Sequence, residues 1–201
     1  MNKLTIILVI CLGLVIGGCS SGPSVKRVST DEVIDLSGKW NDTDSRFVSE
    51  AMIHDSLSRP WLGDFKSSHK GKRPVVIVGT VRNMSHEHIN VQTFTKDLER
   101  ALINSGDVDF VASRKEDKEI REERKQQSQY SSEETAKAEG QEIGADFILQ
   151  GGINTILDKI EGREVMFYQV NLELIEIATH RKVWIGEKKI KKDISRPGSK
   201  L

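Results

Sequence analysis

Two segments of the chain place apolar residues at the three- and four-residue spacing of an amphipathic helix. In the first, the run begins after Asp42 or Thr43, either of which would serve as the helix N-cap, and Pro60 ends it. The second run extends from Val91 to Ser105, and Gly106 supplies its stop. The apolar positions are Phe47, Val48, Ala51 and Met52 in the first run, and Phe94, Leu98, Ala101 and Leu102 in the second. Two helices are therefore expected, each with one face in the core.

Strand patterns account for most of the remaining apolar residues. The β-branched run 75–81 predicts a strand buried on both faces, and residues 108–112 predict a short strand. Residues 164–177 alternate apolar and polar side chains, which indicates a strand with one solvated face. This segment and its neighbours 144–157 and 182–190 are typical of an antiparallel meander. The glycine pair within 144–157 predicts a bulge or a close backbone approach.

Residues 61–72 lack a sustained period and are expected to form a loop. Its two aromatic residues, Trp61 and Phe65, should fold back onto the domain. Residues 114–130 instead repeat opposite charges at helical spacing, and such pairs stabilise an exposed helix by roughly 0.2–0.5 kcal/mol each. A solvated helix is therefore predicted for this stretch.

A capping-box pattern at Ser131 and Glu134 predicts one more helix, running to about Ile143. Together, the elements indicate an α/β layered domain: one mixed sheet with an antiparallel C-terminal meander, covered by helices.

The N-terminus has the pattern of an export signal. Lys3 precedes an apolar run from Leu4 to Ile16, which fits the roughly 7–15 residues of a secretory signal and is shorter than the ~20 of a membrane span. The glycine pair 17–18 before Cys19 resembles a bacterial lipobox and predicts cleavage and lipid attachment at Cys19. An ordinary signal peptide cut near the glycines is the alternative. Ser20, where an inner-membrane retention signal would have aspartate, favours the outer membrane.

The expected organisation is a lipoprotein signal peptide over residues 1–18, a short flexible tether over 19–34 and one domain over 35–201. The tether is rich in small, polar and charged residues. Because about 15 residues span at most ~50 Å when stretched, the domain should lie close to its membrane.

The 30 basic and 30 acidic residues argue against a nucleic-acid or anionic-lipid surface as partner. Cleavage would remove Cys11 with the signal peptide, and lipidation would use Cys19, so the mature chain would keep no cysteine for a disulfide or for thiol chemistry.

The sequence contains no motif for hydrolytic or nucleotide chemistry: neither a G-x-S-x-G elbow nor a phosphate-binding glycine loop is present. The nearest approach to a zinc motif is "HEHIN", in which Asn90 stands where the second zinc histidine is needed. His86 and His88 could share a metal from a loop, and a metal-dependent hydrolase is one hypothesis, but no third ligand lies nearby. No catalytic residue, metal, cofactor or small-molecule substrate is therefore predicted, and the lipid on Cys19 is the one covalent group expected.

The segment "DLSGKWNDTDSRFVSEAMI", residues 35–53, gathers a tryptophan, carboxylates and an arginine ahead of the first helix. Asp42 and Asp44 could form a pair for acid/base chemistry or a hard cation, but Arg46 occupies the next alternate ligand position. Helix capping needs fewer assumptions, because carboxylates in a first turn accept free backbone N–H groups and favour the positive end of the helix dipole. Trp40 would then anchor the start of the helix against the core. A protein-contact role is the third interpretation.

Three segments, in this order, resemble the LpoB family of outer-membrane lipoproteins that activate peptidoglycan synthases: residues 35–53, "RPVVIVGTVRN" at 73–83 and "GADFILQGGI" at 144–153. The resemblance implies a fold like the N-terminal domain of TolB. It also implies a non-catalytic regulator of cell-wall synthesis, anchored by lipid in the outer membrane with its domain in the periplasm. Such a protein binds a class A penicillin-binding protein and stimulates its glycan polymerisation and peptide cross-linking. Well-known members carry a long proline-rich tether, whereas the tether expected here is short.

Residues 35–53 are the most specific part of this resemblance. They supply the candidate partner contacts, which are Trp40, Asn41, Asp42, Asp44 and Arg46. The "GADFILQGGI" segment is shared more loosely with curli-secretion lipoproteins. A structural subunit of an envelope assembly or secretion system is therefore the alternative to a synthase activator.

Overall fold

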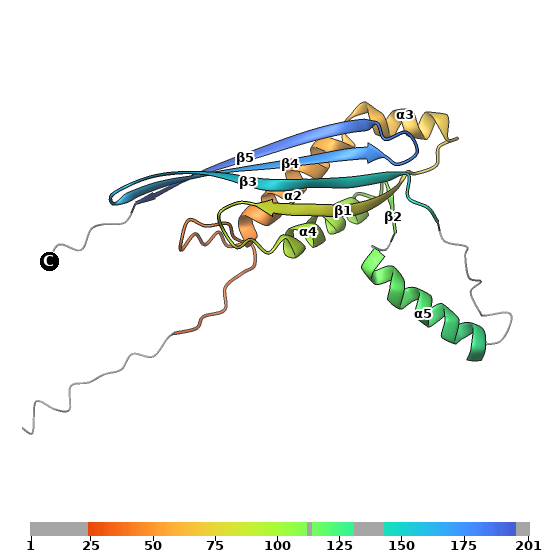
Figure 1. Cartoon of the computed structure of the whole chain (residues 1–201), viewed down its shortest axis with the longest axis horizontal. Helices are drawn as coiled ribbons and strands as arrows, with labels where there is room; N and C mark the ends of the chain where they lie inside the picture. The colour runs from red at the N-terminus through yellow and green to blue at the C-terminus, as the bar shows by residue number, and fades with distance from the viewer. Residues whose placement is uncertain (1–23, 112–113, 131–142, 196–201) are drawn as a thin grey trace, which may run out of the picture. The chain divides into compact units, whose positions relative to one another are not determined.

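The computed structural model describes residues 24–111, 114–130 and 143–195 (Figure 1). The chain divides into two units, residues 1–32 and 33–201. In the first unit the described residues are exposed and form one turn, in which the N–H of Glu32 donates to the carbonyl oxygen of Ser29 at 3.2 Å. Cys19 and nearly all of the helix predicted from the capping box lie outside the described residues.

The second unit contains four helices and five strands among the described residues. The helices are α2 (Asp42–Leu57), α3 (Pro60–Ser68), α4 (Val91–Ser105) and α5 (Arg114–Tyr130). The strands are β1 (Val75–Met84), β2 (Asp109–Phe110), β3 (Phe147–Ile160), β4 (Arg163–Glu176) and β5 (Lys182–Ser195). No helix in this described part is both long and apolar enough to cross a membrane.

All five strands join in one sheet with the order β2-β1-β3-β4-β5. β1 is parallel to β2 and to β3, whereas β3, β4 and β5 pair antiparallel. The predicted α/β domain with one mixed sheet and an antiparallel C-terminal meander is therefore confirmed. The solvated helix predicted for residues 114–130 is confirmed as α5, and its described side chains are mostly exposed.

One face of the sheet packs against α2 and α4, which lie on the same side of the strands in Figure 1. Alternate residues of β4 point into this core and are at most 3% exposed: Met166, Tyr168, Val170, Leu172 and Leu174. On the other face, Met84, Ile156 and Ile185 are each more than half exposed. The prediction that β1 is buried on both faces is therefore wrong, because only its helix-facing residues are consistently buried.

The core face of α2 is more polar than its apolar spacing predicted. Small hydroxyl residues fill much of the contact, and Thr43, Ser45, Ser49 and Ser56 are all buried. Phe47, expected in the core, is instead 53% exposed. The helix therefore turns its small polar residues toward the sheet and α4, and leaves an aromatic ring in solvent.

Residues 60–68 form α3, so the predicted loop is wrong over this stretch. Pro60 stands in the first turn, where its missing N–H removes no helix hydrogen bond and its fixed φ suits the helix. The rings of Trp61 and Phe65 pack edge-on against Phe147, with centroids 5.0 and 5.5 Å away. The prediction that both aromatics fold back onto the domain is thus confirmed.

Gly151 marks the close backbone approach predicted for the glycine pair. A Cβ at this position would lie 2.0 Å from the carbonyl oxygen of Asn171 on β4. The bulge lies on the neighbouring strand, where the pairing of β1 with β3 shifts between Val78 and Val81. The approach lets β3 and β4 stay paired along their full length, from Phe147 to Ile160.

Candidate functional site

Asn41 caps the first turn of α2. Its side-chain oxygen accepts a hydrogen bond from the N–H of Asp44 at 3.0 Å, and the Asp44 carboxylate accepts one from the N–H of Asn41, also at 3.0 Å. This reciprocal pair is a capping box. The prediction that Asp42 or Thr43 is the N-cap is therefore wrong, whereas a capping role for Asp44 is confirmed. Asp42 stands in the first turn with its side chain exposed.

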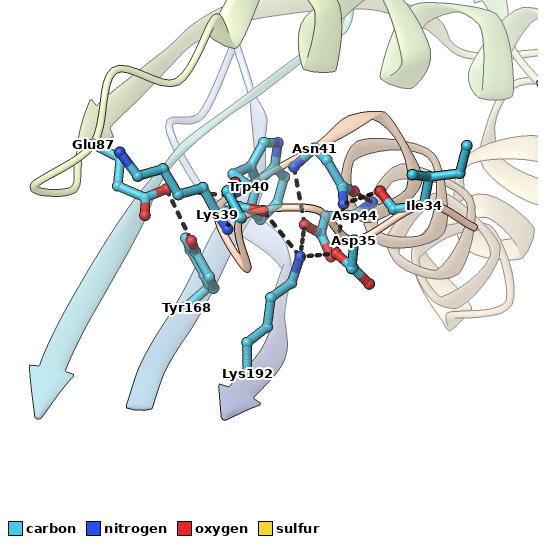
Figure 2. Close-up of polar contacts among 10 residues, drawn as sticks. Ile34, Asp35, Lys39, Trp40, Asn41, Asp44, Glu87, Tyr168 and Lys192 are labelled. Atoms are coloured by element: carbon cyan, nitrogen blue, oxygen red, sulfur yellow. Dashed lines mark hydrogen bonds and ion pairs between the residues drawn. The ribbon is translucent and has the colours of Figure 1, made fainter. Parts of the chain in front are cut away.

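The capping carboxylate also pairs with a lysine from the far end of the chain. Nζ of Lys192, on β5, lies 2.6 Å from Oδ2 of Asp44, 2.9 Å from Oδ1 of Asp35 and 3.0 Å from the carbonyl oxygen of Lys39 (Figure 2). Asn41 Nδ2 donates to the same Asp35 oxygen at 2.6 Å. These five residues, which we call the Lys192 cluster, fasten the segment before α2 to the edge strand of the sheet.

The Lys192 ammonium is partly withdrawn from water, with 12% of its side chain exposed. Burial would lower the pKa of Lys192, but the hydrogen bonds and charges of Asp44 and Asp35 outweigh burial and raise it above the ordinary value. The hydrogen bond from Lys192 likewise lowers the pKa of Asp35. Both groups are therefore charged across the physiological range, and the cluster holds a fixed ion pair.

Trp40 anchors the same segment from its other side, as predicted. Its ring packs edge-on against Tyr168 and Phe94, with centroids 5.5 and 6.0 Å away. Its backbone N–H donates to Oε2 of Glu87 at 3.2 Å, and the Tyr168 hydroxyl donates to the same oxygen at 2.8 Å (Figure 2). Trp40, Glu87, Phe94 and Tyr168 form the Trp40 cluster. Burial, followed by the hydrogen bond and charge of Glu87, raises the pKa of Tyr168 well above its ordinary value.

The two clusters give three of the candidate contact residues internal partners. Trp40, Asn41 and Asp44 all bond or pack within the domain. Asp42 and Arg46 are different, because Asp42 is exposed and Arg46 lines a groove. Sequence reasoning missed Lys192, Glu87 and Tyr168. No spacing signal could have found them, since their partners are 47 to 157 residues away in the chain.

A groove of about 680 Å³ runs between α2 and α4. Its apolar lining comes from Ile53, Leu57 and Ala101, and its charged lining includes Arg46 and Arg100. Pockets of this size are common at ligand and partner sites. The groove is therefore a second candidate for a functional surface, in addition to the start of α2.

The two histidines considered for a metal do not converge with other ligands in the described part of the chain. The His86 ring nitrogen Nδ1 lies 3.0 Å from the hydroxyl of Thr155, and His88 is exposed. Among described residues no group of three or more His, Cys, Asp or Glu side chains could hold a metal ion. The geometry at these residues is that of a surface loop bonded to β3.

The sequence of the domain matches a known family. A family model described as "Peptidoglycan-synthase activator LpoB" matches residues 44–190. This chain belongs to the LpoB family. Members of the LpoB family are non-catalytic activators of peptidoglycan synthases. The match begins at Asp44, so Trp40, Asn41 and Asp42 lie just before the matched residues.

Solved structures of LpoB domains resemble the fold at low sequence identity. The LpoB C-terminal domain from Salmonella enterica is 15% identical, with a TM-score of 0.41 over 73% of this chain and 98% of that one. The corresponding domain from Escherichia coli is 18% identical, with a TM-score of 0.40 over 76% and 99%. Lipoprotein GNA1162 from Neisseria meningitidis is 13% identical, with a TM-score of 0.34 over 63% and 88%. A comparison with curated proteins returned no match.

Proposed function

We propose that this protein binds a class A penicillin-binding protein in the periplasm and stimulates its glycan polymerisation and peptide cross-linking, without catalysing a reaction itself. The LpoB family match over residues 44–190 carries the proposal, because it spans the domain from α2 into β5. The proposal includes a fold related to the N-terminal domain of TolB. It includes no cofactor, nucleic acid or small-molecule substrate.

The proposed location is the outer membrane, with lipid attached to Cys19 and the domain facing the periplasm. The lipobox-like sequence before Cys19 supports this location. A Cys19→Ser variant should then be released from the membrane fraction, and radiolabelled palmitate should label the wild-type protein alone. Because the expected tether is short, the domain meets the synthase only if the synthase extends toward the outer membrane or the envelope geometry differs from that of the well-known members; otherwise this relative has another target.

The five candidate contact residues divide into two proposed roles. Asp42 and Arg46 present side chains to solvent or to the groove and are proposed to touch the partner. Trp40, Asn41 and Asp44 have their polar groups or rings occupied inside the domain. Asn41 and Asp44 are proposed to hold the first turn of α2 in the orientation that presents the other two, and Trp40 is proposed to stabilise the segment before it.

The experiment that tests the proposal uses the purified mature protein and the host's class A synthases, one at a time, with lipid II as substrate. Faster glycan polymerisation and a saturable binding signal with one synthase are expected. The same protein denatured by heat, and a synthase lacking its transpeptidase domain, separate specific stimulation from a detergent-like effect. No binding and no rate change with any class A synthase would contradict the proposal.

The alternative is a structural subunit of an envelope assembly, which must associate with itself. Light scattering of the purified protein at increasing concentration decides between the two. A monomer that stimulates a synthase favours the activator, and a stable ring or higher oligomer without effect on synthases favours the assembly.

A further inference from the structure

The groove between α2 and α4 has an apolar floor that side chains of the domain do not fill. Ile53 is 3% exposed, and Leu57 and Ala101 are half-buried beside it. Polar residues such as Ser49 and Asn104 form the walls. An apolar side chain of a partner could therefore enter between the two helices and remove the exposed parts of Leu57 and Ala101 from water.

Two of the three acidic residues that line the groove already have cations as partners. Asp97 accepts hydrogen bonds from Ser45 at 2.9 Å and Arg100 at 2.8 Å, and Asp107 lies 2.8 Å from Nζ of Lys66. Their negative charges are thus compensated within the domain. The charges that remain for a ligand are those of Arg46 and Glu50, one helical turn apart on α2.

The Arg46 side chain has no hydrogen bond or ion pair to another described residue, although its backbone carbonyl accepts a hydrogen bond from the Ser49 hydroxyl at 2.9 Å. Its guanidinium instead lies over the ring of Phe47, 5.2 Å from the centroid. Phe47 is the only aromatic residue among the exposed large apolar side chains of the described chain. Arginine and aromatic residues carry a large share of binding energy in protein interfaces, and a guanidinium without a partner favours a carboxylate.

We propose that this groove is the docking site for a segment of the synthase that carries an apolar side chain next to a carboxylate. The apolar side chain would rest on Ile53, Leu57 and Ala101, and the carboxylate would pair with Arg46. This inference rests on the proposed function and adds the site and the chemistry of the segment that binds there.

The shape of the groove favours such a segment over a second copy of this chain. In a two-fold dimer whose axis passes through the groove, the two concave grooves would face each other and leave a cavity between them. Two Arg46 side chains would also approach each other. A convex segment of another protein can fill the groove and supply the carboxylate partner that the Arg46 guanidinium lacks among the described residues.

The test compares binding and stimulation by full-length mature variants with the synthase that wild type activates. Arg46→Ala should weaken binding by about tenfold, and Phe47→Ala by a similar factor. Ala101→Trp places a ring on the floor and should abolish stimulation. Because Ala101 is half-buried, Asn104→Trp serves as a second filling variant at an exposed wall position. Arg82→Ala is the matched control, since Arg82 is an exposed arginine on β1.

Every outcome decides the inference. Weaker binding by the groove variants, with melting temperatures and the Arg82→Ala control unchanged, supports it. Filling variants that bind and stimulate like wild type overturn it, although the proposed function then stands. A wild-type protein that binds no synthase overturns both.

Identification of the bound segment gives an independent check. A photo-crosslinking amino acid at position 50 should attach to one segment of the synthase, and mass spectrometry should find in it an apolar residue within about one helical turn of Asp or Glu. A crosslink only to a second copy of this chain, or to a segment without an acidic residue, would overturn the inference.

Discussion

Lys192, on the last strand, places Nζ 2.6 Å from Oδ2 of Asp44, 148 residues earlier in the first turn of α2. The two side chains are 12% and 10% exposed, so the pair is shielded from water on most sides. Since Asp44 also closes the capping box with Asn41, one carboxylate connects the helix start, the preceding segment and the edge of the sheet. The orientation of α2 on the sheet therefore depends on this pair.

Replacing Lys192 should destabilise the domain, because it leaves the Asp44 carboxylate nearly buried without its cation. We expect Lys192→Met to lower the free energy of unfolding by about 3 kcal/mol in urea titrations. Lys189→Met is the control, because Lys189 pairs with Glu187 at the surface and should cost less than about 1 kcal/mol. In a double-mutant cycle, Lys192→Met and Asp44→Asn together should cost clearly less than the sum of the single changes. Additive costs would show that the two side chains are not coupled.

Stability should fall at alkaline pH. Folding raises the pKa of Tyr168 above its ordinary value of 10.0, so the neutral phenol contributes stability that is fully present below pH 10 and is lost as pH rises further. The raised pKa of Lys192 acts in the same direction above 10.5. The urea midpoint of the wild type should thus be flat from about pH 7 to 9 and decline above about pH 10. In the Tyr168→Phe variant, the loss of stability that begins near pH 10 should disappear, and the loss that Lys192 causes at higher pH should remain. A pH profile identical to that of the wild type would contradict the role assigned to Tyr168.

The apolar pattern predicted the sheet well, because a buried face every second residue leaves a regular signal along β3, β4 and β5. The apolar pattern failed to predict which face of a helix is buried where small polar residues form the contact with the core. α2 buries Ser45 and Ser49, so the apolar residues alone placed Phe47 on the wrong side. The helix at Pro60 was missed because a proline can end one helix and begin the next.

The candidate site was predictable in part. The segment before α2 was recognised, and Asp44 was assigned to capping, but three consecutive residues, Asn41 to Thr43, are all good caps, and only the backbone geometry selects Asn41. Lys192 belongs to a lysine-rich strand in which spacing assigns a side of the sheet but not a partner. Long-range pairs of this kind follow from the packing of α2 on β5, which local sequence does not specify.

Two glycines should respond in opposite directions to alanine. At Gly151 the new Cβ would meet the carbonyl oxygen of Asn171 at 2.0 Å, so Gly151→Ala must push β3 from β4 and should cost about 3 kcal/mol or more. At Gly63, inside α3, no atom lies within 4 Å of the added Cβ, and Gly63→Ala should stabilise the domain by about 0.5–1 kcal/mol. Urea unfolding of the two variants and the wild type measures whether each substitution raises or lowers the free energy of unfolding. A stable Gly151→Ala variant would show that the two strands can separate at low cost.

Replacing Trp40 distinguishes a structural role from a contact role for the segment before α2. Trp40→Ala removes the edge-on contacts with Phe94 and Tyr168 and should lower the free energy of unfolding by about 2–3 kcal/mol, because the ring is half-buried. Trp40→Phe keeps an aromatic ring in place and should recover most of that loss. At a temperature well below the transition of the variant, synthase binding should be retained, since the remaining bonds of the Lys192 cluster still hold the start of α2. Binding that is lost in both variants while the melting temperature of Trp40→Phe stays at the wild-type value would instead make the indole a direct contact with the partner.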